Sequence, residues 1–467
     1  MVLSLQTNLS YLSSSGSGDP NENQGLGVGG PIIKDDTLKL HKVVDGLDLP
    51  TNMAFLGPDD ILVLEKNKGT VQRIVNGNML EVPVLDANVS NYVERGMLGI
   101  AVKNEYTDKK DYEDNNIPLH TYVYLYYTES PADEKKSGKN DTNQDCTFCI
   151  PIGHRLYRYE LQNNTLIHPK LLLDLPANTG TSGASHIGGV LEVGPDTNIY
   201  LTVGDGNSCQ NNGCKDGIQN KTLNAQTSNI AEGELPVGRG GILRVSEDGE
   251  FENNGILGNK YPLNLYYAYG IRNSFGIDFD PITGKLWDTE NGPGFGDEIN
   301  LVEPGFNSGW IQVQGIWPIS NYNLLDSTPK EKGYFGDTEI SNKPKNLVTF
   351  DGKGKYSSPE FTWDESVGVT AIKFLNSDKL GAKYENDLFV GDSGNLYHFD
   401  LKEHRTALDL KGKLSDKVAN NDRELDELFV AREFPIIVDI ETSPDGYLYI
   451  LSYDGSIYKI TKKSQVD

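Results

Sequence analysis

The chain has 467 residues, and its 42 basic and 67 acidic side chains give a formal net charge of −25. So acidic a surface is repelled by phosphate groups, which argues against nucleic acid and anionic membranes as partners. No run of about 18 apolar residues occurs in the sequence, so no membrane-spanning helix is predicted.

The first 35 residues are rich in Ser, Gly and Asn and predict a flexible segment. They lack the basic start and long apolar stretch of a signal peptide. We expect that a signal or anchor has been removed and that the protein works outside the cytoplasm. Glycosylation-type triplets fit an exported surface; they begin at Asn8, Asn88, Asn140, Asn163 and Asn220.

From residue 36 onward the chain returns to one kind of unit, in which Pro, Asp and Gly turns separate short alternating strands. The units lie at 57–74, 120–161, 194–206, 280–292, 385–401 and 443–460. Six units predict an all-β fold, a single six-bladed β-propeller of four-stranded antiparallel sheets over residues 36–467. Two β-sandwich domains are the alternative, but no linker divides the sequence. Residues 415–433 are the stretch most typical of a helix.

Four cysteines form two local pairs, Cys146 with Cys149 and Cys209 with Cys214. We predict a disulfide within each pair, as in proteins of oxidising compartments. A joint zinc site and free thiols are the alternatives.

The stretch 184–206 places His186 before Gly188 and Gly189, and a strand-like run then ends at Asp205. Glycines let a ligand approach the backbone closely. One excursion between adjacent strands would bring Asp205 beside His186, and a carboxylate that holds an imidazole makes a general base. A structural, hydrogen-bonded histidine is the alternative.

The stretch 267–310 contains two further candidate sites. Arg272 and Asn273 lie between strand-like segments, where they would be displayed at the mouth of a channel. The loop 290–300 offers backbone carbonyls at Gly292 and Pro293, and its carboxylates are Asp297 and Glu298. Oxygen ligands of this kind suit Ca²⁺, and the alternative is an ordinary loop with solvated acids.

Several motifs in this order resemble the glucose/sorbosone dehydrogenase family of soluble quinoprotein sugar dehydrogenases. They are VERGMLGIAV (93–102), SHIGGVLEVGPDTNIYLTVGD (185–205), GRGGILRVSEDG (238–249), YGIRNSFGIDFDPITGKLW (269–287) and ENGPGFGDEINLVEPGFNSGW (290–310). The resemblance implies a six-bladed propeller that oxidises aldose sugars at C1 with pyrroloquinoline quinone (PQQ) and Ca²⁺. A sugar substrate and an external electron acceptor follow as partners.

The resemblance also implies roles for individual residues. His186 matches the catalytic base, Asp205 the acid that holds it, and Arg272 a group that polarises the quinone. Asn273 and Glu94 match further cofactor contacts. The metal ligands that it implies are the carbonyls of Gly292 and Pro293 for the calcium at PQQ, with Asp297 and Glu298 in a second, structural calcium loop.

The sequence departs from the family at the groups that pair with the carboxylates of PQQ. The family's lysine is missing after DLFVG, and its two arginines are replaced by Ile436 and Val438. Arg432, Lys353 or Lys355 are the candidates to compensate for this loss of charge. A non-catalytic propeller that binds carbohydrate or protein, and a calcium-dependent lactonase, are therefore kept as alternatives.

Overall fold

The computed structural model describes residues 30–106, 118–131, 145–177, 184–206, 225–250, 254–318, 322–323, 328–329 and 346–463. Within these ranges the regular structure consists of β-strands and short 3-10 turns, at Gln226–Ser228, Leu263–Leu265 and Gly412–Asp416. The prediction of an all-β fold is confirmed. No helix in the described ranges is long and apolar enough to cross a membrane.

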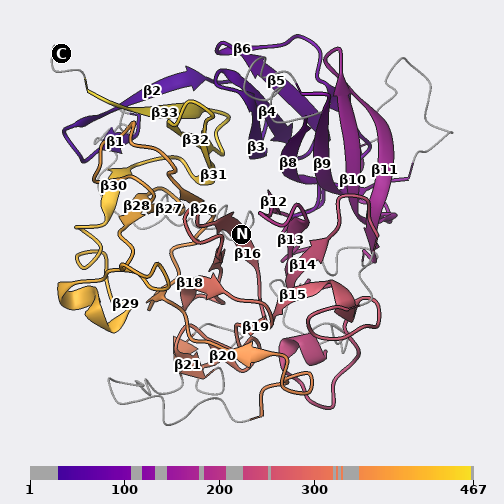
Figure 1. Cartoon of the computed structure of the whole chain (residues 1–467), viewed down its shortest axis with the longest axis vertical. Coiled ribbons are helices and arrows are strands. Elements are labelled where there is room, and N and C mark those ends of the chain that lie inside the picture. The colour runs from indigo at the N-terminus through magenta and orange to yellow at the C-terminus, as the bar shows by residue number, and fades with distance from the viewer. Residues whose placement is uncertain are drawn as a thin grey trace, which may run out of the picture.

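The first three large sheets follow one another along the chain (Figure 1). The first contains β3 (Pro50–Gly57), β4 (Asp60–Glu65), β5 (Thr70–Val75), β6 (Asn78–Met79) and β7 (Leu85–Asp86). The second contains β8 (Met97–Glu105), β9 (His120–Glu129), β10 (Gly153–Gln162) and β11 (Thr165–Leu175). The third contains β12 (Leu191–Val193), β13 (Ile199–Val203), β14 (Gly241–Val245), β15 (Tyr266–Tyr269), β19 (Phe306–Asn307) and β24 (Lys355–Tyr356).

Three more large sheets complete the set. The fourth contains β16 (Ser274–Phe279), β17 (Leu286–Glu290), β18 (Asp297–Val302), β25 (Phe361–Trp363) and β29 (Val418–Ala419). The fifth contains β26 (Ala371–Phe374), β27 (Leu388–Gly391), β28 (Leu396–Phe399), β30 (Phe429–Arg432) and β1 (Ile32–Ile33). The sixth contains β31 (Ile437–Thr442), β32 (Leu448–Ser452), β33 (Ile457–Lys462) and β2 (Leu38–Val44). Two small hairpins pair β20 (Val313–Gln314) with β21 (Trp317–Pro318), and β22 (Tyr322–Asn323) with β23 (Thr328–Pro329).

The innermost strand of each large sheet packs against the innermost strand of the next sheet. The order β3, β8, β12, β16, β26, β31 returns to β3, and Figure 1 shows these strands around a common centre. This ring confirms a β-propeller and excludes a pair of sandwich domains. The prediction of purely antiparallel, four-stranded sheets is wrong, because long loops return to add the short parallel pairs β15–β19, β19–β24 and β25–β29.

The two ends of the domain close the ring. Strand β2, from the start of the domain, pairs with β33 from its end. Ile32 and Ile33 already form a strand against β30, although we expected the flexible segment to run to residue 35. Residues 1–29 lie outside the described ranges.

The helix expected over residues 415–433 is absent. That stretch contains the end of a 3-10 turn, the strand β29, several turns and the strand β30. The side chain of Glu424 accepts a hydrogen bond from the backbone N–H of Asn420, and the side chain of Asn421 accepts one from Arg423. Such local side-chain bonds offer the backbone an alternative to a helix.

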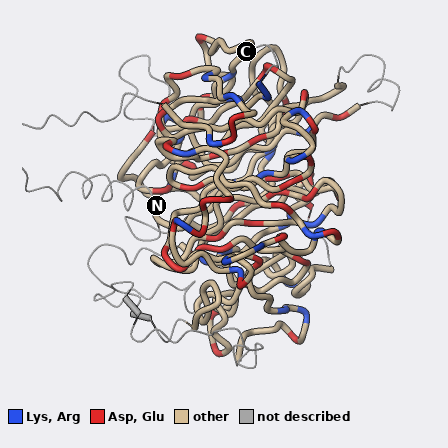
Figure 2. Tube along the Cα trace, turned by 90° about the vertical axis from the view of Figure 1, so that its left-hand side faces the viewer, with Lys and Arg blue, Asp and Glu red and all other residues tan. Residues whose placement is uncertain are grey.

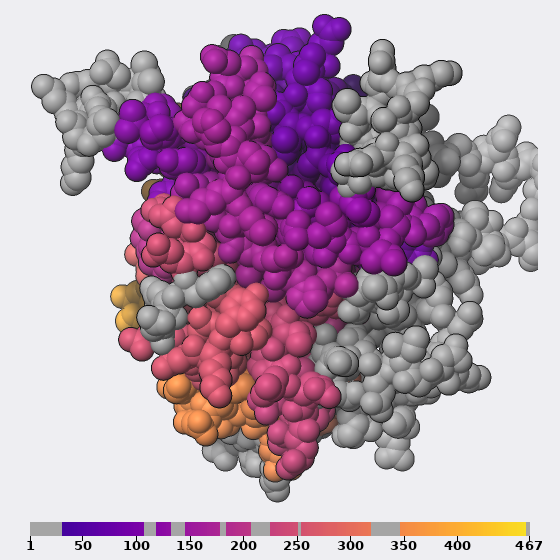
Figure 3. All heavy atoms as spheres, turned by 90° about the vertical axis from the view of Figure 1, so that its right-hand side faces the viewer, coloured from indigo at the N-terminus to yellow at the C-terminus, as the bar shows by residue number. Residues whose placement is uncertain are grey.

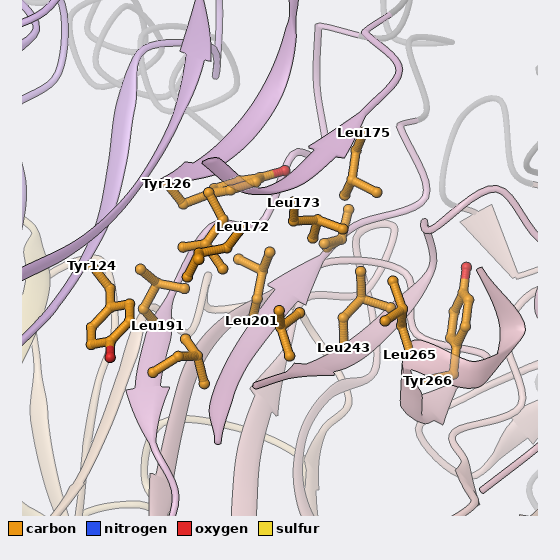
Figure 4. Close-up of a cluster of buried hydrophobic side chains, with 14 of the residues drawn as sticks. Tyr124, Tyr126, Leu172, Leu173, Leu175, Leu191, Leu201, Leu243, Leu265 and Tyr266 are labelled. Carbon is orange, nitrogen blue, oxygen red and sulfur yellow. The ribbon is translucent and has the colours of Figure 1, made fainter. Parts of the chain in front are cut away.

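The hydrophobic core lies between neighbouring sheets. Figure 4 shows one such cluster, where Tyr126 and Leu173 of the second sheet meet Leu201 and Leu243 of the third. The outer surfaces of the same two sheets form a continuous face in Figure 3. Acidic positions are spread over the whole described trace in Figure 2, as the net charge requires. Apolar contacts between neighbouring sheets therefore hold the ring.

The predicted bridge between Cys146 and Cys149 is not present, since both residues are free thiols. The Cys149 thiol instead lies 3.7 Å from the carbonyl oxygen of Cys146. Burial and this neighbouring cysteine raise the pKa of Cys149 to about 11, so its thiol is unreactive at neutral pH. Cys209 and Cys214 lie outside the described residues.

The closing strand yields a test of the fold. Leu38 on β2 is fully buried in the core between the fifth and sixth sheets. We expect Leu38→Ala to lower the free energy of unfolding by about 2–5 kcal/mol, as for other buried leucines. Leu40→Ala, at a partly buried position of the same strand, should cost less. Chemical denaturation measures both, and equal losses would contradict a closing role for the Leu38 side chain.

Candidate active site

One face of the ring gathers most of the predicted site residues. Glu94, His186 and Arg272 come shortly before β8, β12 and β16, the innermost strands of three sheets. Asp205 follows β13, which runs antiparallel to β12, so it reaches the same face. The four side chains are all buried. The structure therefore brings together residues that are far apart in the sequence.

His186 and Asp205 form the predicted pair. The imidazole Nδ1 of His186 lies 2.7 Å from Oδ1 of Asp205. The other oxygen of Asp205 accepts a hydrogen bond of 2.8 Å from the indole N–H of Trp310. Burial and the charge of Arg272 lower the pKa of His186, while Asp205 and Glu94 oppose the change. The imidazole is thus neutral at neutral pH, with Nδ1 held and Nε2 the nitrogen that can accept a proton.

The glycines after His186 have a structural role that we did not predict. His186 itself has a φ of 54°, Gly188 one of 67° and Gly189 one of 118°. A Cβ on Gly188 would lie 2.6 Å from the carbonyl oxygen of Thr202, and one on Gly189 would lie 2.7 Å from Cβ of Leu98. The interpretation that these glycines open the backbone to a ligand is wrong, because protein atoms fill that space. They instead allow the sharp turn that aims His186.

Arg272 is fixed by its backbone and by one end of its guanidinium. Its N–H donates to Oε1 of Glu290 at 2.7 Å, and Nη1 donates to the carbonyl of Asn291 at 2.8 Å. The guanidinium also lies over the ring of Trp310, 5.5 Å from the centroid. Burial lowers the pKa of Arg272, against the opposing effect of surrounding carboxylates, Asp205 first among them. The arginine is held in place without a direct ion pair to any of the described residues.

Two buried polar atoms at this face have no hydrogen-bond partner among the described residues. They are Nε of Arg272 and Oδ1 of Asn273. Leaving such atoms unpaired is costly, so a ligand bound beside His186 would gain by pairing with them. A donor beside an acceptor suits a quinone that carries carbonyl and ring N–H groups. The residues present therefore fit the quinone end of the cofactor.

Glu94 lies beside His186, and a lysine that we did not predict lies near it. Oε2 of Glu94 accepts a hydrogen bond of 3.3 Å from the N–H of Ile187. Lys66 follows β4 at the same face and is only 5% exposed. Burial lowers the pKa of Lys66 to about 8, and the charge of Glu94 opposes this change. Nothing in the stretch around Lys66 marks it as functional, since a lysine at a Gly turn is ordinary.

The proposed substitutes for the missing basic residues lie elsewhere. Arg432 is exposed on β30, and its guanidinium covers the ring of Phe429. Lys353 and Lys355 are exposed beside and on β24, an edge strand of the third sheet. All three lie on or beside outer strands of their sheets, away from the innermost strands that His186 and Arg272 precede.

The predicted metal loop is held by its own hydrogen bonds. Asp297 accepts from the N–H of Gly292 and the hydroxyl of Ser366, both at 2.8 Å, through Oδ1. Its Oδ2 accepts from two further backbone N–H groups, of Val367 and Gly368. Four donors saturate this carboxylate, so in this arrangement Asp297 ties the loop down and does not offer an oxygen to a metal ion. The assignment of the Gly292 and Pro293 carbonyls as calcium ligands stays a prediction.

Glu298 points to the other side of β18, as neighbours on a strand do. Its Oε1 accepts from Gln314 at 3.0 Å and from the N–H of Gly315, and its Oε2 accepts from Asn300 at 3.0 Å. The two predicted acids therefore do not converge on one ion. The role assigned to this pair from the family resemblance is not supported by the geometry.

Glu298 belongs instead to a buried acid cluster behind Arg272. The hydroxyl of Ser308 lies 2.6 Å from Oε2 of Glu290 and 3.1 Å from Oε2 of Glu298. Burial raises the pKa of Glu290 to about 8, assisted by Asp288, and burial raises the pKa of Asp288 itself to about 7. Protons are therefore retained in this cluster at neutral pH.

Comparisons with known proteins identify the family of this chain. The family model described as Glucose / Sorbosone dehydrogenase matches residues 47–459. The aldose sugar dehydrogenase YliI of Escherichia coli is 24% identical over 92% of this chain and 94% of its own length. The quinoprotein glucose dehydrogenase B of Acinetobacter calcoaceticus is 30% identical over 60% of this chain and 54% of its own.

Solved structures share the fold at lower identity. The apo form of the soluble aldose sugar dehydrogenase from Escherichia coli covers 91% of this chain and all of its own, with 20% identity and a TM-score of 0.59. The PQQ-bound aldose sugar dehydrogenase from Streptomyces coelicolor covers 93% of this chain, with 19% identity and a TM-score of 0.55. At these identities the structures support the propeller alone.

The buried acid cluster predicts a dependence of stability on pH. Glu290 has a folded pKa of about 8 and an unfolded pKa of about 4.3, so between these values the folded state binds more protons. Stability should therefore fall as pH rises through this window. In Glu290→Gln the melting temperature should fall less steeply, while the exposed Glu385→Gln should follow the wild type. Calorimetry at several pH values tests this, and an unchanged slope in Glu290→Gln would refute it.

Proposed function

The chain belongs to the glucose/sorbosone dehydrogenase family, and from this membership we propose that it is a six-bladed propeller enzyme that oxidises aldose sugars at C1 with PQQ and Ca²⁺. Membership and relatives support an oxidoreductase acting on sugars. The observation that carries the more specific proposal is the buried Trp310–Asp205–His186 chain beside Arg272. The six large sheets in cyclic contact support the blade number.

In this proposal His186 starts the reaction by taking the proton of the sugar's anomeric hydroxyl at Nε2. Asp205 holds Nδ1–H, which fixes the tautomer and stabilises the imidazolium that forms. Trp310 keeps Asp205 in position, so the carboxylate cannot rotate away from the imidazole. The low pKa of His186 keeps the base in its reactive form at neutral pH.

PQQ, when bound, would supply an electrophilic quinone that accepts the hydride from C1. Arg272 and Asn273 would hold it through the two buried atoms that lack partners. The fixed guanidinium of Arg272 would stabilise negative charge that develops on a neighbouring oxygen. Ca²⁺, in the family's manner, would be bound by the carbonyls of Gly292 and Pro293, because the carboxylate of Asp297 is already saturated.

The catalytic proposal predicts a graded set of variants. His186→Ala should lower turnover about 10²–10⁴-fold, the usual effect of losing a positioned base. Asp205→Asn should lower it less, since this residue orients the imidazole and does not take the proton. Dye reduction with an aldose, PQQ and Ca²⁺ measures both, with quinone binding as the control for an intact site. Equal rates in wild type and His186→Ala would assign His186 a structural role only.

Lys66 is our candidate for part of the missing charge toward the carboxylates of PQQ. It is a buried lysine whose charge interacts with Glu94, and its pKa of about 8 still leaves it largely protonated at neutral pH. We expect Lys66→Ala to raise the dissociation constant for PQQ about ten- to hundredfold, as for loss of a charged hydrogen bond. Lys68→Ala, exposed and paired with Asp48, is the matched control.

Quinone absorbance and fluorescence titrations give this result without any turnover assay. Equal affinities of Lys66→Ala and Lys68→Ala would remove Lys66 from the proposal. If the wild type itself binds no PQQ, the loss of the family's basic residues at Ile436 and Val438 is decisive. A binding propeller without catalytic activity then becomes the better description.

We also propose that the protein acts outside the cytoplasm and passes electrons to a separate acceptor. Its acidic composition and its relatives among sugar dehydrogenases support the proposal.

A further inference from the structure

A second group of potential ligands lies on the opposite face of the ring, in the fifth sheet. Asp387 comes directly before β27, His398 lies on β28, and Asp400 directly follows β28. Phe389 pairs with His398 in the antiparallel register. Positions two residues apart on a strand share a face, so Asp387, His398 and Asp400 all point to one side of the sheet.

The site is remote from the active face. The hairpin between β27 and β28 turns at Asp392, and the strand β26 beside it begins at the face where His186 lies. Asp387 and Asp400 stand at the other end of the same two strands. A ligand bound there would leave His186 and Arg272 untouched.

The three side chains converge at metal-binding distances. Nε2 of His398 lies 3.0 Å from Oδ2 of Asp387 and 3.7 Å from Oδ1 of Asp400. One ligand atom from each residue lies within 4.8 Å of the other two. Tetrahedral Zn²⁺ with ligands at about 2.0–2.2 Å separates those ligands by about 3.3 Å. The measured distances bracket this value, so an ion fits with small side-chain adjustments.

The local electrostatics favour a cation. Two carboxylates meet here with one imidazole. The lysines that line the adjoining cavity include Lys383 and Lys411, which pair with Asp35 at 3.1 Å and with Asp409 at 2.9 Å. A divalent ion would relieve the repulsion between the two acids.

Aromatic side chains hold the imidazole of His398 in place, and a cavity adjoins the three proposed ligands. Tyr384 and Phe389 contact the imidazole ring of His398, with centroids at 4.8 and 5.3 Å, and so restrict its orientation. A cavity of about 370 Å³ adjoins the site and is lined by His398 and Asp400 together with Lys34, Asp35 and Leu414. Such a cavity leaves room for water or a small anion at the remaining coordination positions.

We propose that Asp387, His398 and Asp400 bind a divalent transition metal of the Zn²⁺ type. One imidazole with two carboxylates suits Zn²⁺ and its neighbours, whereas Ca²⁺ prefers oxygen ligands alone. The site is distinct from the calcium proposed at Gly292 and Pro293, in place and in chemistry.

Calorimetric titration of the full chain, after treatment with a chelator, tests the proposal. Zn²⁺ should bind with one strong site, and Co²⁺ at the same site should give visible absorption bands of a four- or five-coordinate ion. His398→Gln and Asp387→Asn should weaken binding at least about tenfold. His120→Gln is the matched control, because His120 pairs with a single acid, Glu160, at 2.8 Å.

Asp400→Asn serves as the second variant, since Asp400 is 53% exposed and its change leaves the fold intact. It should also weaken Zn²⁺ binding, and an excess of Ca²⁺ should not displace the bound Zn²⁺. The proposal would be overturned if the wild type did not bind Zn²⁺ stoichiometrically. It would also be overturned if His398→Gln and Asp400→Asn bound Zn²⁺ as strongly as the wild type.

Discussion

A single buried ammonium group ties the inner strands of the ring together beneath the active face. Nζ of Lys373, on β26, lies 3.1 Å from Asp278 on β16, 3.0 Å from Glu441 on β31 and 3.6 Å from Glu192 on β12. Burial disfavours its charge, yet the three carboxylates together raise the pKa of Lys373 well above its ordinary value. Removing the lysine would leave buried carboxylates unpaired, which costs far more than the pairs themselves contribute. The channel of this propeller is thus specified by charge as well as by apolar packing.

This arrangement has a consequence for the site. Glu192 lies on the strand that His186 precedes, and Asp278 lies on the strand that Arg272 precedes. A common lysine partner fixes the spacing of these two strands, and therefore of the base and the guanidinium above them. One lysine does not offset the burial of all these acids, because burial raises the pKa of Glu192 to about 8 even with Lys373 nearby. The channel holds more acid than one lysine can neutralise.

The sequence predicted the parts of this protein that depend on local pattern. The alternating strands and Asp-Gly turns indicated a propeller, and the spacing of His186 and Asp205 indicated their pairing across a hairpin. Prediction from the sequence failed where contacts between distant segments determine the structure. The parallel pair β15–β19 and the bond from Trp310 to Asp205 join residues brought together only by the ring. The saturation of Asp297 depends on donors at 366–368, which no motif around Asp297 could reveal.

The catalytic and cofactor-binding halves of the site have different electrostatic requirements. Arg272 is surrounded by Asp205, Asp297 and Glu94, whose charges favour its protonated form, whereas Glu290 retains its proton at neutral pH. Its positive charge is therefore balanced within the protein, and little of it is left to neutralise a tricarboxylate. Arg272 can still donate a directed hydrogen bond, because its unpaired Nε–H in a buried site would polarise a carbonyl at short range. The carboxylates of a quinone cofactor need a further positive charge, and Lys66 is a buried lysine at this face, where Glu94 balances part of its charge. Catalysis can thus persist in a sequence that has lost the family's usual anchors, provided that binding energy comes from a different edge of the cofactor.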